Sequence, residues 1–495
     1  MKKTFKNIFA ATVLAATLAT GCSKSDLVDL DPQFSLDALN NPSSIDQVEE
    51  VLTAAYSRFR SGSYYGDGSG SGFSLMPDMM SDNLLETNES LANYKSLTDW
   101  IYAEDDALVE GIWAAPYAVI TNANIVLRDI DKFTTADNKT RANRIKGQAL
   151  AIRAHAHFDL FRYFATSYDR NSTTALAVPY VTEFQVLPSV RPARLNNKDF
   201  YDRVIADLTA AVGLLGTVDA TINPSAIKRP NIDLAGAKAI QARVYLYAGM
   251  YTEAIAAASD VITARPLVSS ANFAGMYNEQ TAGEIIWNVQ FDAGQGGPGG
   301  GVFFSQNNRS AYAPAADIAT MDGTSGLIQN NDIRYPAYFA TVTGPNGPRL
   351  IVRKYRGKAA LTDGNANFPV YRTGEMYLIR AEARARISPA QETAAMNDLN
   401  VLRTARIAGY TTETLTGAAL LTAIANERRR ELFGEGHRFF DLKRTTRTVI
   451  RAGGCGNPSI SPAVCTLPST AREWALPIPF DERAVNENIQ QNPGY

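Results

Sequence analysis

Long segments with helical periodicity fill much of this sequence and constrain its fold more than any other feature. In the segment 44–60 apolar side chains recur at intervals of three and four residues, which places them on one face of a helix. The same pattern returns in seven further segments, at 108–130, 139–163, 198–215, 234–263, 373–386, 392–407 and 415–433. Short strands are predicted only at 284–291, 349–355 and 474–478. The sequence therefore predicts a mainly α fold.

One helical segment carries the marks of a repeat unit. Small, aromatic, turn and breaker residues stand at Ala242, Tyr245, Gly249, Tyr251, Ala254 and Pro266. These are the offsets of a tetratricopeptide unit, in which Gly249 ends the first helix and Ala254 lets the second pack closely. A looser copy spans 377–406. One unit cannot bury its own apolar face, so we predict a tetratricopeptide-like α-superhelix.

The predicted superhelix is interrupted by irregular chain. Its helices lie at about 44–60, 108–266 and 373–433, and an insert rich in Gly, Pro and Asn lies at about 267–372. We expect the irregular loops and the few short strands to form a ligand platform on one side of the helices. A single domain over 44–495 is predicted.

The N-terminus predicts export. Three lysines precede an apolar run from Ile8 to Ala19, which is too short to span a bilayer and is typical of a signal peptide over 1–21. Gly21-Cys22 then resembles the lipobox of bacterial lipoproteins, which predicts lipidation of Cys22; ordinary secretion is the alternative. Residues 22–43 would form the tether, and its acidic residues resemble the tag that sends some lipoproteins to the outer cell surface.

Two more cysteines stand ten residues apart near the C-terminus. Cys455 and Cys465 lie in a segment rich in Gly, Pro and Ser, and an even number of cysteines in an oxidising compartment favours one disulfide. Two unpaired thiols are the alternative.

Charge and composition exclude several function classes. Removal of residues 1–21 takes away three lysines and no acid, so the formal net charge changes from −2 to −5, which argues against nucleic acid. With 3 His and 3 Cys, metal chemistry is poorly supplied, whereas 22 Tyr, 21 Phe and 4 Trp offer many flat rings. His155 and His157 point about 200° apart on a helix and cannot bind one metal.

Catalytic motifs are equally weak. Glu427 and Glu431 could act as an acid and base pair, but neighbouring arginines would lower their pKa values, and a general acid needs the opposite shift. The spacing of Gly294, Gly296 and Gly299 matches GxGxxG, yet neither a helix nor a lysine follows, which favours a flexible loop. We predict no enzyme, no cofactor and no metal.

The C-terminal region is the most specific part of the sequence. Asn426–Arg444, NERRRELFGEGHRFFDLKR, and Leu476–Tyr495, LPIPFDERAVNENIQQNPGY, resemble the two signatures of the SusD/RagB family, surface glycan- and nutrient-binding lipoproteins of Bacteroidetes. Other segments agree in the family's order, namely LMPDMMSDNL (75–84), the Trp113, Tyr117 and Asn124 spacing, GEIIW (283–287), NNDIR (330–334) and MYLIRAEARAR (376–386). The signature region spans 426–495, and its own residues favour a structural role through ion pairs and apolar anchors.

The resemblance implies a fold, a ligand and a partner. It implies a tetratricopeptide-like scaffold, no catalysis, and a SusC-like TonB-dependent outer-membrane transporter over which the lipoprotein sits as a lid. The protein would then be lipid-anchored in the outer membrane, facing the cell exterior, and would bind and deliver an oligosaccharide or a polysaccharide such as starch. Alternatives are the same role for peptides or another polymer, a structural adaptor, or a surface glycoside hydrolase.

Aromatic residues on loops are the candidate ligand contacts. A sugar ring packs its apolar C–H face on an aromatic ring, while its hydroxyls need polar partners. Three loop groups supply both kinds: Tyr64 and Tyr65; Asn93, Tyr94 and Trp100; and Phe303, Asn307, Arg309 and Tyr312. These groups correspond to regions that carry ligand contacts in the resembling family. Trp113 and Trp287 lie in periodic apolar segments, so we assign them to the core.

Overall fold

The computed structural model describes residues 42–67, 70–184, 190–218, 222–223, 225–301, 303–304, 308–451, 455 and 464–495. The chain divides into two compact units, Met1–Gln47 and Val48–Tyr495. Among the described residues of the first unit, the backbone N–H of Ser43 donates to the side chain of Gln47. Helix α3 (Ile45–Arg58) begins there and continues into the second unit, which the following paragraphs describe by itself.

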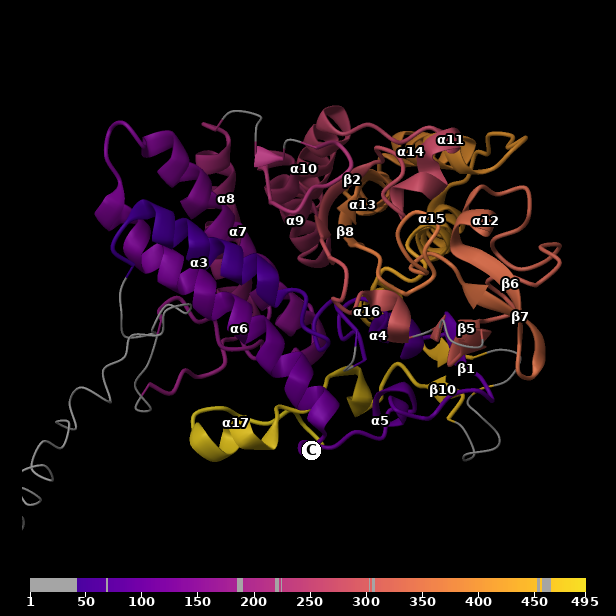
Figure 1. The fold of residues 1–495 in the computed structure, drawn as a ribbon, viewed down its shortest axis with the longest axis horizontal. Coiled ribbons are helices and arrows are strands. Elements are labelled where there is room, and N and C mark those ends of the chain that lie inside the picture. Colours follow the sequence, from indigo (N-terminus) through magenta and orange to yellow (C-terminus); the bar gives the residue numbers. More distant parts are fainter. Residues whose placement is uncertain are drawn as a thin grey trace, which may run out of the picture. The chain divides into compact units, whose positions relative to one another are not determined.

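Long helices form the scaffold of the second unit. They are α6 (Ala107–Asp129), α7 (Lys139–Phe164), α8 (Asn197–Leu215), α9 (Leu234–Tyr247), α10 (Tyr251–Ala264), α13 (Thr373–Arg386), α14 (Glu392–Arg406) and α15 (Gly417–Glu431). Helices from α6 to α10 each pack on the next in chain order, α10 packs on α13, and α13 contacts both α14 and α15 (Figure 1). The predicted mainly α fold is confirmed, and each predicted helix is present.

Side-chain caps fix where several of these helices begin. The carboxylate of Asp106 accepts hydrogen bonds from the first turn of α6, and Asn196 does the same for α8. Asp233 accepts from the backbone N–H of Gly236 across 2.9 Å at the start of α9. Each cap satisfies a backbone donor that has no partner inside its helix, which places the helix start at that residue.

The two predicted repeat units are antiparallel helix pairs. Between α9 and α10, Gly249 adopts a positive φ of +70°, a conformation that favours glycine, and the chain reverses there. Ala254 on α10 is fully buried, as its role as a close-packing residue predicts. In the second pair, Ala381 of α13 packs in one apolar cluster with Leu399 of α14 and Ile424 of α15. Small residues at these contacts let the helices approach closely.

In the described parts of the chain, the strands form five short antiparallel pairs. They are β1 (Leu84–Glu86) with β5 (Tyr312–Pro314), β2 (Ile285–Val289) with β8 (Phe368–Arg372), β3 (Phe303–Phe304) with β4 (Arg309–Ser310), β6 (Phe339–Gly344) with β7 (Gly347–Val352), and β9 (Val449–Ile450) with β10 (Thr466–Leu467). The strands predicted at 284–291 and 349–355 are present.

The strand predicted at 474–478 is wrong. A 3-10 turn, η6 (Arg472–Trp474), is followed there by irregular chain. The backbone N–H of Leu476 donates to the carbonyl of Tyr163, and that of Ile478 donates to the side chain of Gln491. These partners satisfy the backbone without a neighbouring strand.

Short helices complete the second unit. They are α4 (Met76–Met79), α5 (Lys95–Thr98), η1 (Ile130–Phe133), α11 (Ser270–Phe273), η3 (Ala274–Met276), η4 (Pro298–Gly301), α12 (Arg334–Tyr338), α16 (Arg438–Arg444) and α17 (Phe480–Val485). Most lie in or beside the loop-rich segments, where they connect the strand pairs to the scaffold.

Two tryptophans anchor the interior, as predicted. Trp287 on β2 is 1% exposed, and its indole N–H donates to the carbonyl of Pro230 across 3.0 Å. Trp113 on α6 is 4% exposed and packs edge-on against Phe164. Both rings are therefore part of the hydrophobic core.

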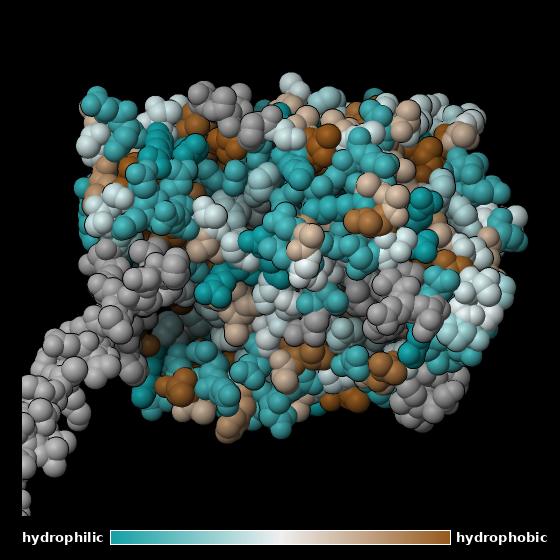
Figure 2. Space-filling model, in the orientation of Figure 1, coloured by the Kyte–Doolittle hydropathy of each residue, from teal (hydrophilic) through white to brown (hydrophobic). Residues whose placement is uncertain are grey.

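One face of the protein is mostly hydrophilic. On the face shown in Figure 2, teal side chains predominate, and brown side chains occur in small scattered groups. Within the part of the chain that the structure describes, no helix combines the length and the hydropathy needed to cross a membrane.

Candidate ligand-binding site

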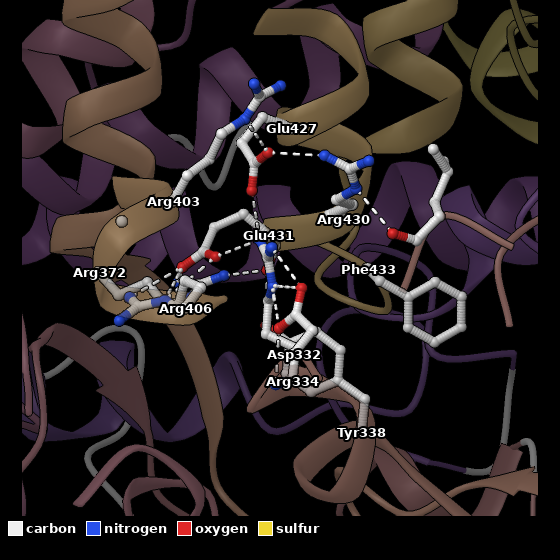
Figure 3. Close-up of polar contacts among 12 residues, drawn as sticks. Asp332, Arg334, Tyr338, Arg372, Arg403, Arg406, Glu427, Arg430, Glu431 and Phe433 are labelled. Atoms are coloured by element: carbon white, nitrogen blue, oxygen red, sulfur yellow. Dashed lines mark hydrogen bonds and ion pairs between the residues drawn. The ribbon is translucent and has the colours of Figure 1, made fainter. Parts of the chain in front are cut away.

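A network of buried charges surrounds Glu427 on α15 (Figure 3). Its carboxylate accepts from Arg334 across 2.6 Å, from Arg403 across 2.8 Å and from Arg430 across 2.9 Å. Burial alone would raise the pKa of Glu427, but the positive charges of these arginines outweigh it and hold the pKa at about 2. Glu427 is therefore a permanent anion.

Glu431, one turn further along α15, has a similar environment. Arg406 and Arg334 donate to it across 3.0 and 2.9 Å, and Arg372 also donates to its carboxylate. Burial would raise its pKa, but Arg406, Arg372 and Arg334 lower it far below the usual range. Neither carboxylate can act as a general acid, which agrees with the expectation from the flanking arginines.

This network has a structural role. Arg334 begins α12 in the loop-rich insert, Arg372 ends β8, and Arg403 and Arg406 lie on α14. All of them meet the carboxylates of α15 in the interior, as Figure 3 shows. The NNDIR and NERRRE segments thus fasten the insert to the helical scaffold.

The structure buries the first group of predicted ligand contacts. Tyr64 is 0% exposed and Tyr65 1% exposed, and both hydroxyls donate to one carboxylate oxygen of Asp159, across 2.9 and 2.8 Å. The prediction that the glycine-rich loop displays these rings is wrong. A buried acceptor on α7, more than ninety residues away along the chain, draws both rings inward, and Phe59 and Phe73 pack against them.

Trp100 and Tyr312 are also interior residues, so the prediction that both rings are displayed to a ligand is wrong. Trp100 is 5% exposed, its indole N–H donates to the carbonyl of Met80, and Arg451 stacks on its ring at 4.2 Å. Tyr312 on β5 is 1% exposed. Their partners lie far away along the chain, so the local sequence gave no sign of this burial.

Among the predicted aromatic residues whose side chains the structure describes, Tyr94 reaches the surface. It is half-buried, and its ring stacks on that of Tyr312 with centroids 6.4 Å apart and planes 25° apart. Asn93 beside it is exposed. Burial, and then the charge of Asp67, raise the pKa of Tyr94. The phenol therefore stays neutral and can donate and accept hydrogen bonds.

The glycine-rich loop contributes backbone to this surface. Gly70 has a φ of +85°, and a Cβ there would lie 3.3 Å from Cδ1 of Tyr94 and 2.5 Å from the end of Met76. A side chain at this position would be strained and crowded, so glycine lets Tyr94 lie against the loop. The structure thus brings Gly70, Tyr94 and Tyr312 together.

Arg309 on β4 is half-buried. Its guanidinium donates to the carbonyl of Glu89 across 3.1 Å, and β4 leads directly to β5 with Tyr312. Phe303 lies on β3, which pairs with β4, and its side chain is outside the described part of the structure, as is all of Asn307.

Sequence reasoning missed Glu89, which organises these loops. Its carboxylate accepts from the backbone N–H of Ser310 across 2.9 Å and forms an ion pair with Arg349 of β7 at 3.3 Å. Glu89 is 3% exposed. It therefore links the loop after β1 to β4 and to the β6–β7 hairpin. A lone acid in a polar loop gave no signal of this role.

Neither helical histidine has a metal-binding environment. His155 meets the hydroxyls of Tyr65 and Tyr371 at 2.9 and 3.2 Å, and burial lowers its pKa to about 4. His157 accepts from the backbone N–H of Val181, and burial lowers its pKa to about 3. Among the described residues, no group of three or more His, Cys, Asp or Glu is placed to hold a metal ion.

The structure joins Cys455 and Cys465 in a disulfide, with Cα atoms 5.2 Å apart. The predicted lipidation site, Cys22, lies outside the described residues.

Two family models match separate parts of this chain. The model described as the SusD family matches residues 340–495, and the model described as starch-binding associating with outer membrane matches residues 29–246. The chain belongs to the SusD/RagB family. The first match contains both C-terminal signatures and the whole α13–α15 region.

Other SusD-family proteins match over nearly the full length. SusD-like protein P25 of Formosa agariphila is 24% identical, in a match that covers 96% of this chain and 97% of that protein. SusD-like protein P2 of the same organism is 25% identical, in a match that covers 81% of this chain and 83% of that protein. A SusD superfamily structure from Bacteroides thetaiotaomicron superposes with a TM-score of 0.77 at 24% identity, covering 91% of this chain and 100% of that one. A SusD-like carbohydrate binding protein from Bacteroides vulgatus superposes with a TM-score of 0.73 at 21% identity, covering 90% and 97%. These structures share the fold.

In this SusD-family chain the second signature also serves the scaffold. The side chain of Asn492 donates to the carbonyls of Phe164, at the end of α7, and Leu476, across 2.9 and 2.7 Å. Arg194 donates to the Asn492 side chain across 2.9 Å. The C-terminal segment is thus fastened to the end of the longest helix.

Proposed function

We propose that this protein is a non-enzymatic surface lipoprotein of the outer membrane that binds a glycan and delivers it to a SusC-like TonB-dependent transporter. The observation that carries the binding proposal is the half-exposed ring of Tyr94 stacked on Tyr312, with the exposed Asn93 beside it in the chain and the half-buried Arg309 three residues before Tyr312. We call these four residues the platform. The family's description as starch-binding and the carbohydrate-binding relative of the same fold support the choice of ligand.

The platform suits a sugar for physical reasons. A half-exposed tyrosine offers an apolar face for the C–H groups of a pyranose and a hydroxyl for its polar edge. Tyr312 holds the ring from behind, so little conformational entropy is lost on binding. Asn93 can both donate and accept, and Arg309 carries further N–H donors besides the one that Glu89 occupies.

Delivery requires an anchor and a partner. A lipid on Cys22 would keep the folded part close to the outer membrane. The protein would cover the transporter as a lid and release the glycan into it. Support for this part comes from the family description, which associates such proteins with the outer membrane, and from the signal-like N-terminus.

The test begins with a screen of the purified mature protein against a glycan array and a peptide library. Calorimetry with the best ligand then compares Tyr94→Ala with Tyr377→Ala, a half-buried tyrosine on α13. We expect Tyr94→Ala to weaken glycan binding roughly 2- to 10-fold and Tyr377→Ala to leave it unchanged, since one aromatic contact contributes about 0.5–1.5 kcal/mol. Selective binding of peptides, or unchanged affinity in Tyr94→Ala, would overturn the proposal.

A further inference from the structure

A second concave site lies on another part of the scaffold. This cavity of about 830 Å³, which we call the groove, opens between the loop after α7 (166–171) and the α9–α10 turn (246–251). The segments 443–447 and 469–474 also line it, together with Glu382 and Arg386 of α13. None of the four platform residues lines it. Its volume is in the range of sites that hold small ligands.

Cations outnumber carboxylates around this groove. The basic lining residues are Arg170, Arg386, Lys443, Arg444 and Arg447, and the acidic ones are Asp169 and Glu382. Arg444 occupies both oxygens of Glu382, across 2.6 and 2.8 Å. Arg386 shares that carboxylate through one N–H only, at 2.9 Å. Arg386 is exposed, and its remaining N–H groups have no hydrogen-bond partner among the described residues.

Two of these cations have no carboxylate partner among the described residues. The ammonium of Lys443 donates to the carbonyls of Arg162 and Ala165 at the end of α7, across 2.9 and 2.7 Å, and lies over the ring of Tyr168. The exposed guanidinium of Arg447 forms neither an ion pair nor a side-chain hydrogen bond within that part of the chain. Burial lowers the pKa of Lys443 well below its usual range, so Arg447 supplies the positive charge that an anionic group would find in the groove and that the described residues do not neutralise.

The groove also holds an unused neutral group. Tyr247 lines it and is 6% exposed, and its buried hydroxyl has no hydrogen-bond partner within the part of the chain that the structure describes. Buried polar groups are nearly always satisfied, so an unpaired hydroxyl beside a cavity indicates a missing partner. Tyr251 and Trp474 add aromatic surface to the walls.

We propose that this groove is a second binding site, selective for saccharides that carry a carboxylate or sulfate group. Arg447 and Arg386 would bind the anionic group at the rim through charge-assisted hydrogen bonds, which are the strongest of the polar contacts. Preference for an acidic group follows from the groove alone, whereas the choice of a saccharide as its carrier rests on the proposed function. An acidic glycan would thus be held at two places on one protein.

The test uses the full mature protein with trigalacturonic acid as the probe and maltotriose as the neutral trisaccharide of the same size. We expect calorimetry to show binding of trigalacturonic acid in preference to maltotriose at this groove, with an affinity that falls as salt rises. Arg447→Ala and Arg386→Ala should each weaken it roughly 10-fold or more. Arg353→Ala, which removes an exposed arginine of the insert, should leave it unchanged.

Tyr94→Ala separates this site from the platform. If trigalacturonic acid binding survives Tyr94→Ala but not Arg447→Ala, the groove is a site of its own, whatever the platform binds. The inference is overturned if trigalacturonic acid fails to bind at millimolar concentrations, or if both arginine variants bind it as the unmodified protein does. Loss of binding in Tyr94→Ala alone would place the acidic sugar on the platform and would also overturn it.

Discussion

Arg334 of the insert donates to Glu427 of α15 across 2.6 Å, and both side chains are 0% exposed. Replacing one partner of such a pair leaves an uncompensated charge in the interior, which costs about 3–5 kcal/mol. We expect Glu427→Gln to lower the free energy of unfolding by about that amount, measured by urea denaturation at pH 7.

Glu413→Gln is the matched control, because both carboxylates bind Arg403. Glu413 pairs with it at 2.9 Å, but its side chain is 47% exposed, whereas Glu427 pairs at 2.8 Å in the interior. An exposed pair contributes about 1 kcal/mol or less. Equal losses in the two variants would contradict the structural role of the network.

Acid should destabilise the fold through His157. Burial lowers its pKa from 6.5 to about 3, so between these pH values the unfolded chain binds a proton that the folded chain does not. The stability that neutral, buried His157 contributes is fully present above pH 6.5 and is lost as the pH falls from 6.5 towards 3. By pH 4.5 the loss from His157 is about 2–3 kcal/mol. Urea denaturation at pH 7 and 4.5 should show a smaller decline in His157→Gln than in the unmodified protein.

Asp78 should act in the opposite direction. Burial raises its pKa from 3.8 to about 6, despite hydrogen bonds from Asn83, Gly434 and Gly436. The folded chain therefore takes up this proton first as the pH falls below 6, which stabilises it. Asp78→Asn should make the decline between pH 7 and 4.5 steeper, and a shallower decline would contradict this sign.

The helices and the position of their turns were predictable from the sequence because they depend on neighbouring residues. Periodicity located α6 to α8, and Gly249 marked the reversal between α9 and α10. The candidate site was only partly predictable. Tyr64 and Tyr65 stand among glycines, which usually indicates exposure, yet a distant acid, Asp159, decides that they are buried.

Pairings between distant segments explain the other misses. β1 pairs with β5 across more than two hundred residues, with Glu86 opposite Tyr312, and no local pattern indicates that register. Glu89 likewise meets Ser310 only in the folded chain. Burial of a loop ring depends on such contacts, so loop position alone could not separate Tyr94 from Tyr312.

Aromatic residues of the core and of the platform should respond differently to truncation. Trp287 packs edge-on against Phe59 and His155 in the interior, with centroids 5.2 and 5.1 Å apart. Trp287→Ala should lower the free energy of unfolding by about 3–5 kcal/mol through loss of a buried ring. Tyr94→Ala should hardly change the melting temperature. Calorimetric scans of both variants check this, and equal shifts would place Tyr94 in the core.

The disulfide should be detectable directly. Mass spectrometry of peptides from the non-reduced protein should show Cys455 joined to Cys465, since the structure bonds them. Closing so short a loop stabilises the fold by about 2–3 kcal/mol in the chain-entropy model, so Cys455→Ser with Cys465→Ser should lower stability by about that amount. Labelling of both thiols in the native protein would contradict the bond.

Membrane attachment should depend on Cys22. The described residues contain no helix that could cross a bilayer, and the only sequence signal for an anchor is the lipobox-like Gly21-Cys22. Cys22→Ala should therefore give a folded protein that no longer fractionates with the outer membrane, in cells that lack the partner transporter. Circular dichroism of the released protein, compared with the unmodified one, controls for unfolding. If the variant still fractionates with the membrane in such cells, another part of the chain provides the anchor and the lipoprotein assignment is wrong.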